Sequence, residues 1–191
     1  MATVSSGSSQ SPSARRPPPE VSVLRVGHRP GRDPRLTTHV ALAARAFGAR
    51  RMYLHPRDDA LAERIASVTH RWGGDFAVVP VDDWKSLVRT FPGTVVHLTM
   101  YGLPLEKALP RLGGHRRILL VVGGAKVPPE LYRRAKYNVA VGHQPHSEVA
   151  AVAVTLERLL GLPRPTRAGE APQRIVPSAR GKRIVGGRRR S

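Results

Sequence analysis

Residues 118–128 read ILLVVGGAKVP, and this stretch decides the fold. Its first five residues are all apolar, without the alternation of apolar and polar residues that marks a half-exposed strand. A short continuous apolar run of this kind is typical of a strand buried on both faces of a parallel sheet. Two glycines and a proline then predict that the strand ends in a loop. The stretch therefore predicts a sheet that helices cover on both sides.

Strand and helix patterns alternate on either side of this stretch. The predicted strands cover residues 21–26, 51–54, 76–81, 94–100, 118–122 and 137–141. The predicted helices cover residues 37–47, 58–71, 82–90, 105–112, 129–136 and 147–160, and residues 101–104 are predicted to be a loop. About six β/α units in succession indicate an α/β fold with a mainly parallel sheet and helices on both faces.

The composition divides the chain into three parts. Residues 1–20 are rich in Ser and Pro and are predicted to be a disordered leader. Residues 21–160 form the predicted α/β domain, and residues 161–191 a basic C-terminal extension. Within the extension, RIVP and KRIV flank the four residues SARG, which predicts a β-hairpin over residues 173–187. A disordered extension is the alternative.

The charge of the chain points to a polyanionic partner. Its 191 residues contain 32 Lys and Arg against 13 Asp and Glu, a formal net charge of +19. Residues 161–191 alone carry nine basic residues and one acidic residue. Nucleic acid is the simplest partner for such a chain. A tail that merely keeps the protein in solution would also explain the charge of the extension.

Several classes of protein are excluded or disfavoured. The chain has no Cys, which excludes disulfides, cysteine-ligated zinc, iron–sulfur clusters and thiol nucleophiles. The longest strongly apolar run, residues 118–125, is far short of the roughly 20 residues that span a bilayer, and residues 1–20 lack an apolar signal segment. We therefore expect a cytoplasmic protein without a membrane partner. His143 and His146 lack a third ligand at metal-site spacing, so no metal is expected.

Glycine-rich loops follow three predicted strands in the second half of the chain. They cover residues 98–102, 123–128 and 141–148. Ligands of open α/β sheets bind outside the carboxyl ends of the strands, and glycine lets a ligand approach the backbone closely. The common dinucleotide and P-loop fingerprints are absent. Ordinary βα turns would explain each loop taken singly, but the three together indicate a cofactor site.

A cluster of arginines begins near the end of the first predicted strand and continues into the segment after it. Arg25, Arg29, Arg32 and Arg35 lie within eleven residues, with His28 among them. The guanidinium group binds phosphate through paired hydrogen bonds, so the cluster predicts recognition of a phosphate-bearing substrate. A solvated basic loop is the alternative.

Four blocks of sequence resemble one known family. They are LRVGHRP at 24–30, THVAL at 38–42, HLTMYGLP at 97–104 and YNVAVGHQPHSEVA at 137–150. In this order they are similar to the archaeal tRNA (cytidine-2′-O)-methyltransferases that act on position 56 of the T loop, members of the SPOUT superfamily. The resemblance covers residues 21–160, roughly three-quarters of the chain.

The resemblance implies a fold, a cofactor and a set of site residues. The C-terminal part of the sheet would form a deep trefoil knot that binds S-adenosyl-L-methionine (AdoMet), and the enzyme would be a homodimer acting on tRNA. Arg29 would be the catalytic arginine, with Arg25 and Arg35 as alternatives. The cofactor contacts carried over by position would be Leu98, Gly123, Gly124, Ala125, Lys126, Val127, Val141, Gly142, His143, Gln144, Pro145, His146, Ser147 and Glu148. His143 departs from the family pattern, which has asparagine there.

The implied reaction is AdoMet-dependent methylation of the ribose 2′-oxygen of cytidine 56. Two alternatives stay open: the same fold methylating another RNA nucleotide, and a non-catalytic RNA-binding protein. Bulky residues in place of the loop glycines would favour the second alternative, but the glycines are intact.

Overall fold

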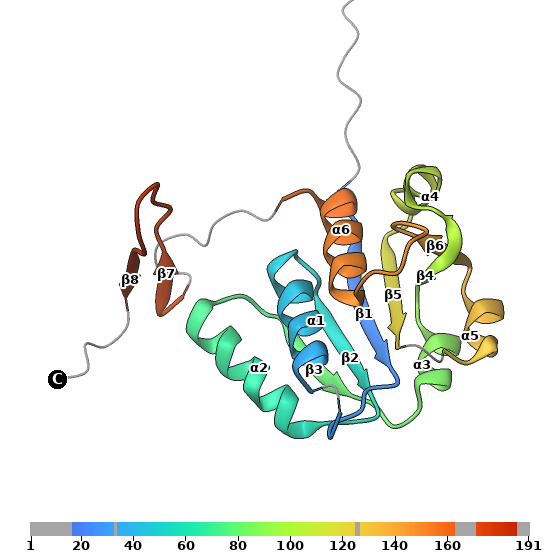
Figure 1. Ribbon diagram of the computed structural model, residues 1–191, viewed down its shortest axis with the longest axis horizontal. Helices are drawn as coiled ribbons and strands as arrows, with labels where there is room; N and C mark the ends of the chain where they lie inside the picture. Colours follow the sequence, from blue (N-terminus) through green and yellow to red (C-terminus); the bar gives the residue numbers. More distant parts are fainter. Residues whose placement is uncertain (1–16, 33, 125–126, 163–170, 187–191) are drawn as a thin grey trace, which may run out of the picture.

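The computed structural model describes residues 17–32, 34–124, 127–162 and 171–186, and Figure 1 shows its helices packed around a central sheet. The strands are β1 Glu20–Val26, β2 Arg51–His55, β3 Ala77–Pro80, β4 Thr94–Pro104, β5 Arg117–Gly123, β6 Tyr137–Ala140, β7 Gln173–Ile175 and β8 Ile184–Gly186. The helices are α1 Pro34–Ala46, α2 Asp59–Trp72, α3 Trp84–Thr90, α4 Leu105–Leu112, α5 Pro129–Arg134 and α6 Glu148–Leu160.

The main sheet has six strands in the order β3-β2-β1-β5-β4-β6. Every neighbouring pair is parallel, which confirms the predicted α/β fold. The strand over 118–122 lies near the middle of the sheet, between β1 and β4, and its side chains are buried from Ile118 to Val122. Because helices cover both faces of the sheet at this strand, all five residues of the run are apolar.

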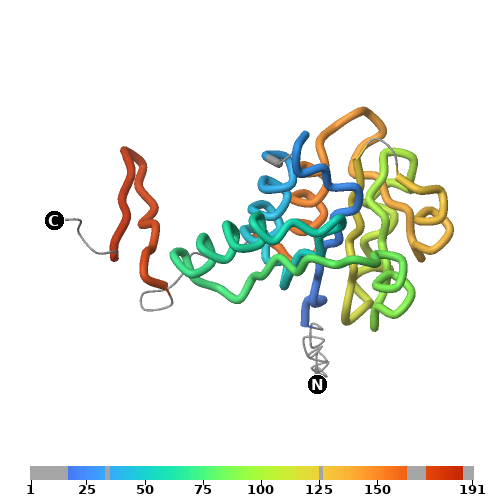
Figure 2. Tube along the Cα trace, turned by 90° about the horizontal axis from the view of Figure 1, so that it is seen from below, coloured from blue at the N-terminus to red at the C-terminus, as the bar shows by residue number. Residues whose placement is uncertain are grey.

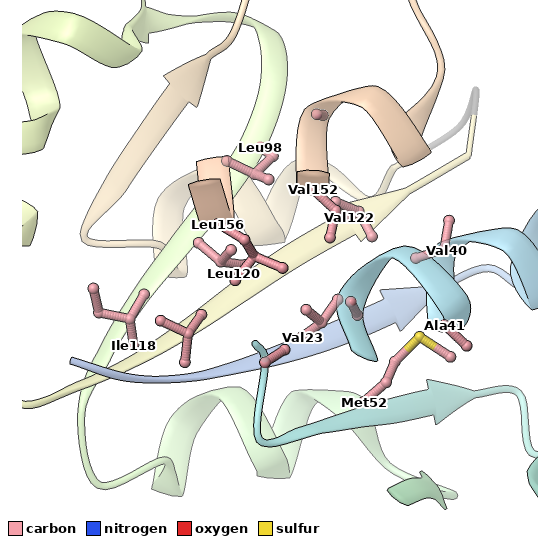
Figure 3. Close-up of a cluster of buried hydrophobic side chains, with 14 of the residues drawn as sticks. Val23, Val40, Ala41, Met52, Leu98, Ile118, Leu120, Val122, Val152 and Leu156 are labelled. Atoms are coloured by element: carbon pink, nitrogen blue, oxygen red, sulfur yellow. The ribbon is translucent and has the colours of Figure 1, made fainter. Parts of the chain in front are cut away.

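Two apolar layers hold the helices against the sheet. The larger layer joins inward-facing residues of the strands to apolar residues of α1, α2, α4 and α6. Figure 3 shows the part of this layer that α1 and α6 form with the strands. The smaller layer, on the other face, packs Trp84 and Val88 of α3 and Leu131 of α5 against the strands. Side chains alternate between the layers along β1, where Val23 faces the larger layer and Leu24 the smaller one.

The predicted loop over 101–104 is wrong, because β4 continues through Pro104. Leu98 and Leu103 of β4 both pair with the same residue of β6, Val139. Residues 99–102 between them therefore bulge out of the ladder. Gly102 makes the bulge possible. A β-carbon on Gly102 would lie 2.4 Å from the backbone nitrogen of Val139. A bulge of this kind leaves no simple pattern in the sequence.

The C-terminal extension contains an antiparallel hairpin of β7 and β8. Its ladder continues beyond the strands, because the Val176 amide donates a hydrogen bond to the Arg183 carbonyl over 2.9 Å. Figure 2 shows the hairpin beyond α2, away from the sheet. Residues 1–16 of the predicted leader lie outside the described residues, and Glu20 already belongs to β1. None of the described helices has the length and apolar character needed to cross a membrane.

Candidate active site

The three glycine-rich segments predicted from the sequence meet at one edge of the sheet. One contains the bulge near the carboxyl end of β4, one begins with the last residue of β5, and one follows β6. These three strands are neighbours in the sheet and run in the same direction. Strand β1, which leads into the arginine-rich segment, is the other neighbour of β5. Parallel strands bring their carboxyl ends to the same edge, where ligands of α/β proteins bind.

Side chains pack closely against the glycines at this edge. A β-carbon on Gly123 would lie 2.4 Å from Cγ2 of Val127, so the segment after β5 folds back over its own start. On the neighbouring strand end, the Nε2–H of His143 donates a hydrogen bond to the Gly102 carbonyl over 3.1 Å. We call the adjoining carboxyl ends of β4, β5 and β6 the cradle. Ala125 and Lys126 lie outside the described residues.

Helix α6 begins at the same edge with a well-formed cap. The Ser147 hydroxyl accepts a hydrogen bond from the Ala150 amide over 3.3 Å, and Glu148 is the first helical residue. An acidic residue in the first turn interacts favourably with the helix dipole. Of the other predicted contacts on this segment, Gln144, Pro145 and His146 are exposed, whereas Val141 and Gly142 are half-buried.

Arg25 is the one arginine of the predicted cluster that is buried. It lies on β1, and its side chain is 1% exposed. Its Nη2 lies 3.6 Å from Oε1 of Glu148, and its Nη1 donates a hydrogen bond to the carbonyl of Val26 over 3.1 Å. A β-carbon on Gly124 would lie 3.8 Å from the same Nη2. Arg25 therefore links the end of β1 to both the segment after β5 and the start of α6.

Arg29 and Arg35 are exposed, on the segment after β1 and on the first turn of α1. The segment that carries Arg29 is anchored by the buried His28. The Nε2–H of His28 donates to Oδ2 of Asp58 over 3.0 Å, and its Nδ1 lies 2.8 Å from the Thr37 hydroxyl. His28 therefore joins this segment to α1 and to the start of α2.

Asp58 is both the partner of His28 and the N-cap of α2. Its Oδ1 accepts a hydrogen bond from the Leu61 amide over 2.9 Å. The hydrogen bond from His28, followed by that from the Leu61 amide, lowers the pKa of the Asp58 carboxyl. The predicted helix over 58–71 begins at Asp58, but the sequence does not indicate the contact with His28, because the two residues are 30 positions apart.

Replacing Asp58 with alanine is expected to lower the free energy of unfolding by about 2 kcal/mol at pH 7, since it removes a cap and leaves a buried histidine nitrogen unpaired. Because the folded-state pKa of Asp58 is depressed, its contribution is complete above the unfolded value of about 3.9. The contribution disappears as the pH falls through the folded-state pKa. Urea unfolding from pH 7 to pH 3 measures the difference from wild type.

The matched control is Asp59→Ala, which changes the adjacent residue. Asp59 is exposed and pairs only at the surface, with Arg57. This variant is expected to stay within about 0.5 kcal/mol of wild type. Equal losses for the two variants would contradict the anchoring role of Asp58.

A buried polar cluster lies under the strand ends of β4 and β6. His97 donates from Nδ1 to Oδ1 of Asn138 over 2.9 Å, and the Asn138 amide donates to the Tyr132 carbonyl over 2.9 Å. The Tyr132 hydroxyl lies 3.0 Å from the Thr99 hydroxyl, and its ring meets that of His97 edge-on. Burial lowers the pKa of His97, so the ring is neutral. His97 belongs to the predicted strand 94–100, but no local pattern in the sequence indicates its contact with Tyr132.

The predicted cofactor contacts that lie within the described residues thus belong to one edge of the sheet, with Arg25 close to Gly124 and Glu148. The same residues contain no group of three or more His, Cys, Asp and Glu side chains that could hold a metal ion.

Comparison with known proteins gives a consistent identification. The family model described as tRNA ribose 2′-O-methyltransferase, aTrm56, matches residues 72–185. A protein of Archaeoglobus fulgidus named tRNA (cytidine(56)-2′-O)-methyltransferase is 51% identical over 166 residues, which cover 87% of this chain and 98% of the relative.

Solved structures with much lower identity share the fold. The TrmH/SpoU tRNA modifying enzyme of A. aeolicus superposes with a TM-score of 0.57 at 14% identity, covering 74% of each chain. The SpoU methyltransferase AviRb of Streptomyces viridochromogenes, solved in complex with AdoMet, gives a TM-score of 0.52 at 16% identity. The match covers 75% of this chain and 60% of AviRb. With its α/β fold of the SpoU/TrmH type and its high identity to the archaeal relative, the chain belongs to the aTrm56 family of tRNA ribose 2′-O-methyltransferases.

Proposed function

We propose that this protein transfers a methyl group from AdoMet to the ribose 2′-oxygen of cytidine 56 in the T loop of tRNA. The observation that carries the proposal is the meeting of three glycine-rich strand ends at one edge, in a chain 51% identical to an enzyme named for this reaction. The net charge of +19 suits a polyanionic substrate.

The cofactor would lie against the cradle at the carboxyl ends of β4, β5 and β6. When bound, AdoMet supplies an electrophilic methyl group on a sulfonium. The residues that we propose to hold it are Leu98, Gly123, Gly124, Ala125, Lys126, Val127, Val141, Gly142, His143, Gln144, Pro145, His146, Ser147 and Glu148. The close approach of Gly102 to the backbone nitrogen of Val139 supports a site built from backbone groups.

The ribose 2′-hydroxyl is a weak nucleophile and needs help to lose its proton. An arginine remains protonated, so it stabilises or orients the developing alkoxide rather than accepting the proton. We assign this role to Arg29, which is exposed on an anchored segment, with Arg35 as the nearest alternative. Arg25, the third candidate, is buried against Glu148, a position that suits support of the cofactor segments.

We propose a homodimer whose interface includes the bulge of β4. Tyr101 is 78% exposed and Leu103 57% exposed, beside the proposed cofactor site. Exposed apolar side chains grouped in this way mark association surfaces. The methyltransferase unit would be residues 21–160, with the trefoil knot formed by its C-terminal part, and the enzyme would act on tRNA in the cytoplasm. Sedimentation equilibrium tests the dimer, and Leu103→Asp should shift it to monomer.

The reaction is tested by incubating the protein with methyl-labelled AdoMet and an unmodified tRNA transcript, then mapping the label by nuclease digestion. Label on the ribose of cytidine 56 is the expected result. Label on another nucleotide would retain the chemistry but overturn the substrate position. Bound tRNA without label would favour a non-catalytic RNA-binding protein.

The hairpin gives a separate prediction about tRNA binding. Its exposed residues Arg180, Lys182 and Arg183 stand on and beside the turn, and the described part of the extension contains no acidic residue. The tRNA association constant K falls as the salt concentration rises. Changing all three residues to glutamine is expected to make the plot of log K against log salt less steep, by about 0.7–0.9 for each tRNA phosphate that the hairpin no longer neutralises. Filter binding at several salt concentrations measures the slope, and an unchanged slope would show that the hairpin does not touch tRNA.

A further inference from the structure

One ion pair at the candidate site differs from the other pairs of arginine with an acidic residue in the described residues. Arg25 is 1% exposed and Glu148 21% exposed, with 3.6 Å between their nearest charged atoms. By contrast, Arg158 of α6 pairs with Glu106 of α4 at the surface, where the side chains are 44% and 63% exposed. Charges screened by water interact weakly, whereas a pair with one buried member interacts strongly.

The position of the pair connects it with the segments that we propose to hold the cofactor. Nη2 of Arg25 lies 3.8 Å from the position that a β-carbon on Gly124 would take. Glu148 is the first residue of α6, after the Ser147 cap. Arg25 is permanently charged, so it places a positive charge beside the cradle. A cationic ligand would be repelled by this charge, and the Glu148 carboxylate offsets it.

We propose that Arg25 and Glu148 together contribute to the charge of the cofactor site, and thereby to how well it distinguishes the sulfonium of AdoMet from the uncharged thioether of S-adenosylhomocysteine (AdoHcy). This inference rests on the proposed function. Donor and product differ by one methyl group and one positive charge. Removing the carboxylate therefore disfavours AdoMet, and removing the guanidinium disfavours AdoHcy relative to AdoMet.

The test is isothermal titration of the full-length protein with AdoMet and AdoHcy in the absence of tRNA. Glu148→Gln keeps the shape of the side chain and is expected to lower the ratio of AdoMet to AdoHcy affinity about tenfold. Arg25→Gln is expected to raise the same ratio. Sinefungin, which carries an amine in place of the sulfonium and its methyl group, should follow AdoMet in both variants because it shares the positive charge.

The matched control is Glu106→Gln, which removes the exposed ion pair between Glu106 of α4 and Arg158 of α6. It should leave the ratio of AdoMet to AdoHcy affinity unchanged. Equal changes in AdoMet and AdoHcy affinity in Glu148→Gln would show that the pair only supports the structure, and would overturn the inference. Should Arg25→Gln fail to fold, Glu148→Gln still decides the question, because its side chain is partly exposed. If the wild-type protein bound neither ligand, the proposed cofactor itself would be wrong.

Discussion

Replacing Arg29 with alanine is expected to slow methyl transfer by about two to three orders of magnitude, while the affinity for AdoMet stays unchanged. Arg29 is exposed on the segment after β1, and the cradle proposed for the cofactor is built by other segments. Loss of a group that stabilises the developing alkoxide affects the rate rather than cofactor binding. Single-turnover transfer to tRNA, combined with titration of AdoMet, separates the two effects.

Arg32→Ala is the matched control, since Arg32 is an exposed arginine of the same segment without a proposed role in the reaction. It is expected to retain transfer within a few-fold of wild type. A wild-type rate in Arg29→Ala together with a large loss in Arg35→Ala would move the role to Arg35. Equal losses of transfer rate in Arg29→Ala and Arg32→Ala would indicate that both arginines attract tRNA through their charge, and that Arg29 has no catalytic role.

Gly102→Ala is expected to be the most disruptive single-methyl change at the site. The new β-carbon would lie 2.4–2.6 Å from backbone atoms of Asn138 and Val139, so β4 and β6 must separate. Overpacking against backbone costs about 3 kcal/mol, which corresponds to a fall in melting temperature of roughly 6–12 °C. AdoMet affinity should fall at least tenfold, because His143, on the segment after β6, donates a hydrogen bond to the Gly102 carbonyl in the bulge.

Gly113→Ala provides the control for this prediction. Gly113 has helical dihedral angles, and its added β-carbon would make an ordinary contact, 3.5 Å from the Leu109 carbonyl. The substitution is expected to be neutral or to stabilise the protein by up to about 1 kcal/mol. Calorimetry and AdoMet titration of both variants test the pair. An unchanged melting temperature in Gly102→Ala would contradict the close approach of the two strands.

The sequence predicted those parts of the fold whose signals are local. The apolar run 118–122 identified a strand buried on both faces, and Ser147 marked the start of α6 within one residue. The grouping of three glycine-rich segments was also predictable, since parallel strands bring successive carboxyl ends to one edge. These features depend on patterns within about ten residues.

The parts that could not be predicted depend on contacts between distant residues. The bulge of β4 depends on the close packing of Gly102 against the backbone of β6, some 36 residues later in the chain. No local sequence pattern predicts this contact. Arg25 belongs to the predicted strand 21–26, but no local pattern shows that its side chain is buried against Glu148 at the start of α6. The anchoring of His28 by Asp58 is likewise a tertiary contact.

The central claim, methyl transfer to one ribose oxygen, is tested most directly by a pair of transcripts that differ by that oxygen. One is an unmodified tRNA, and the other carries 2′-deoxycytidine at position 56. Both are incubated with the full-length protein and methyl-labelled AdoMet, and the label in each is counted. We predict stoichiometric label in the first and none in the second. Equal label in both transcripts would contradict the claim, because the methyl group would then be attached to another atom.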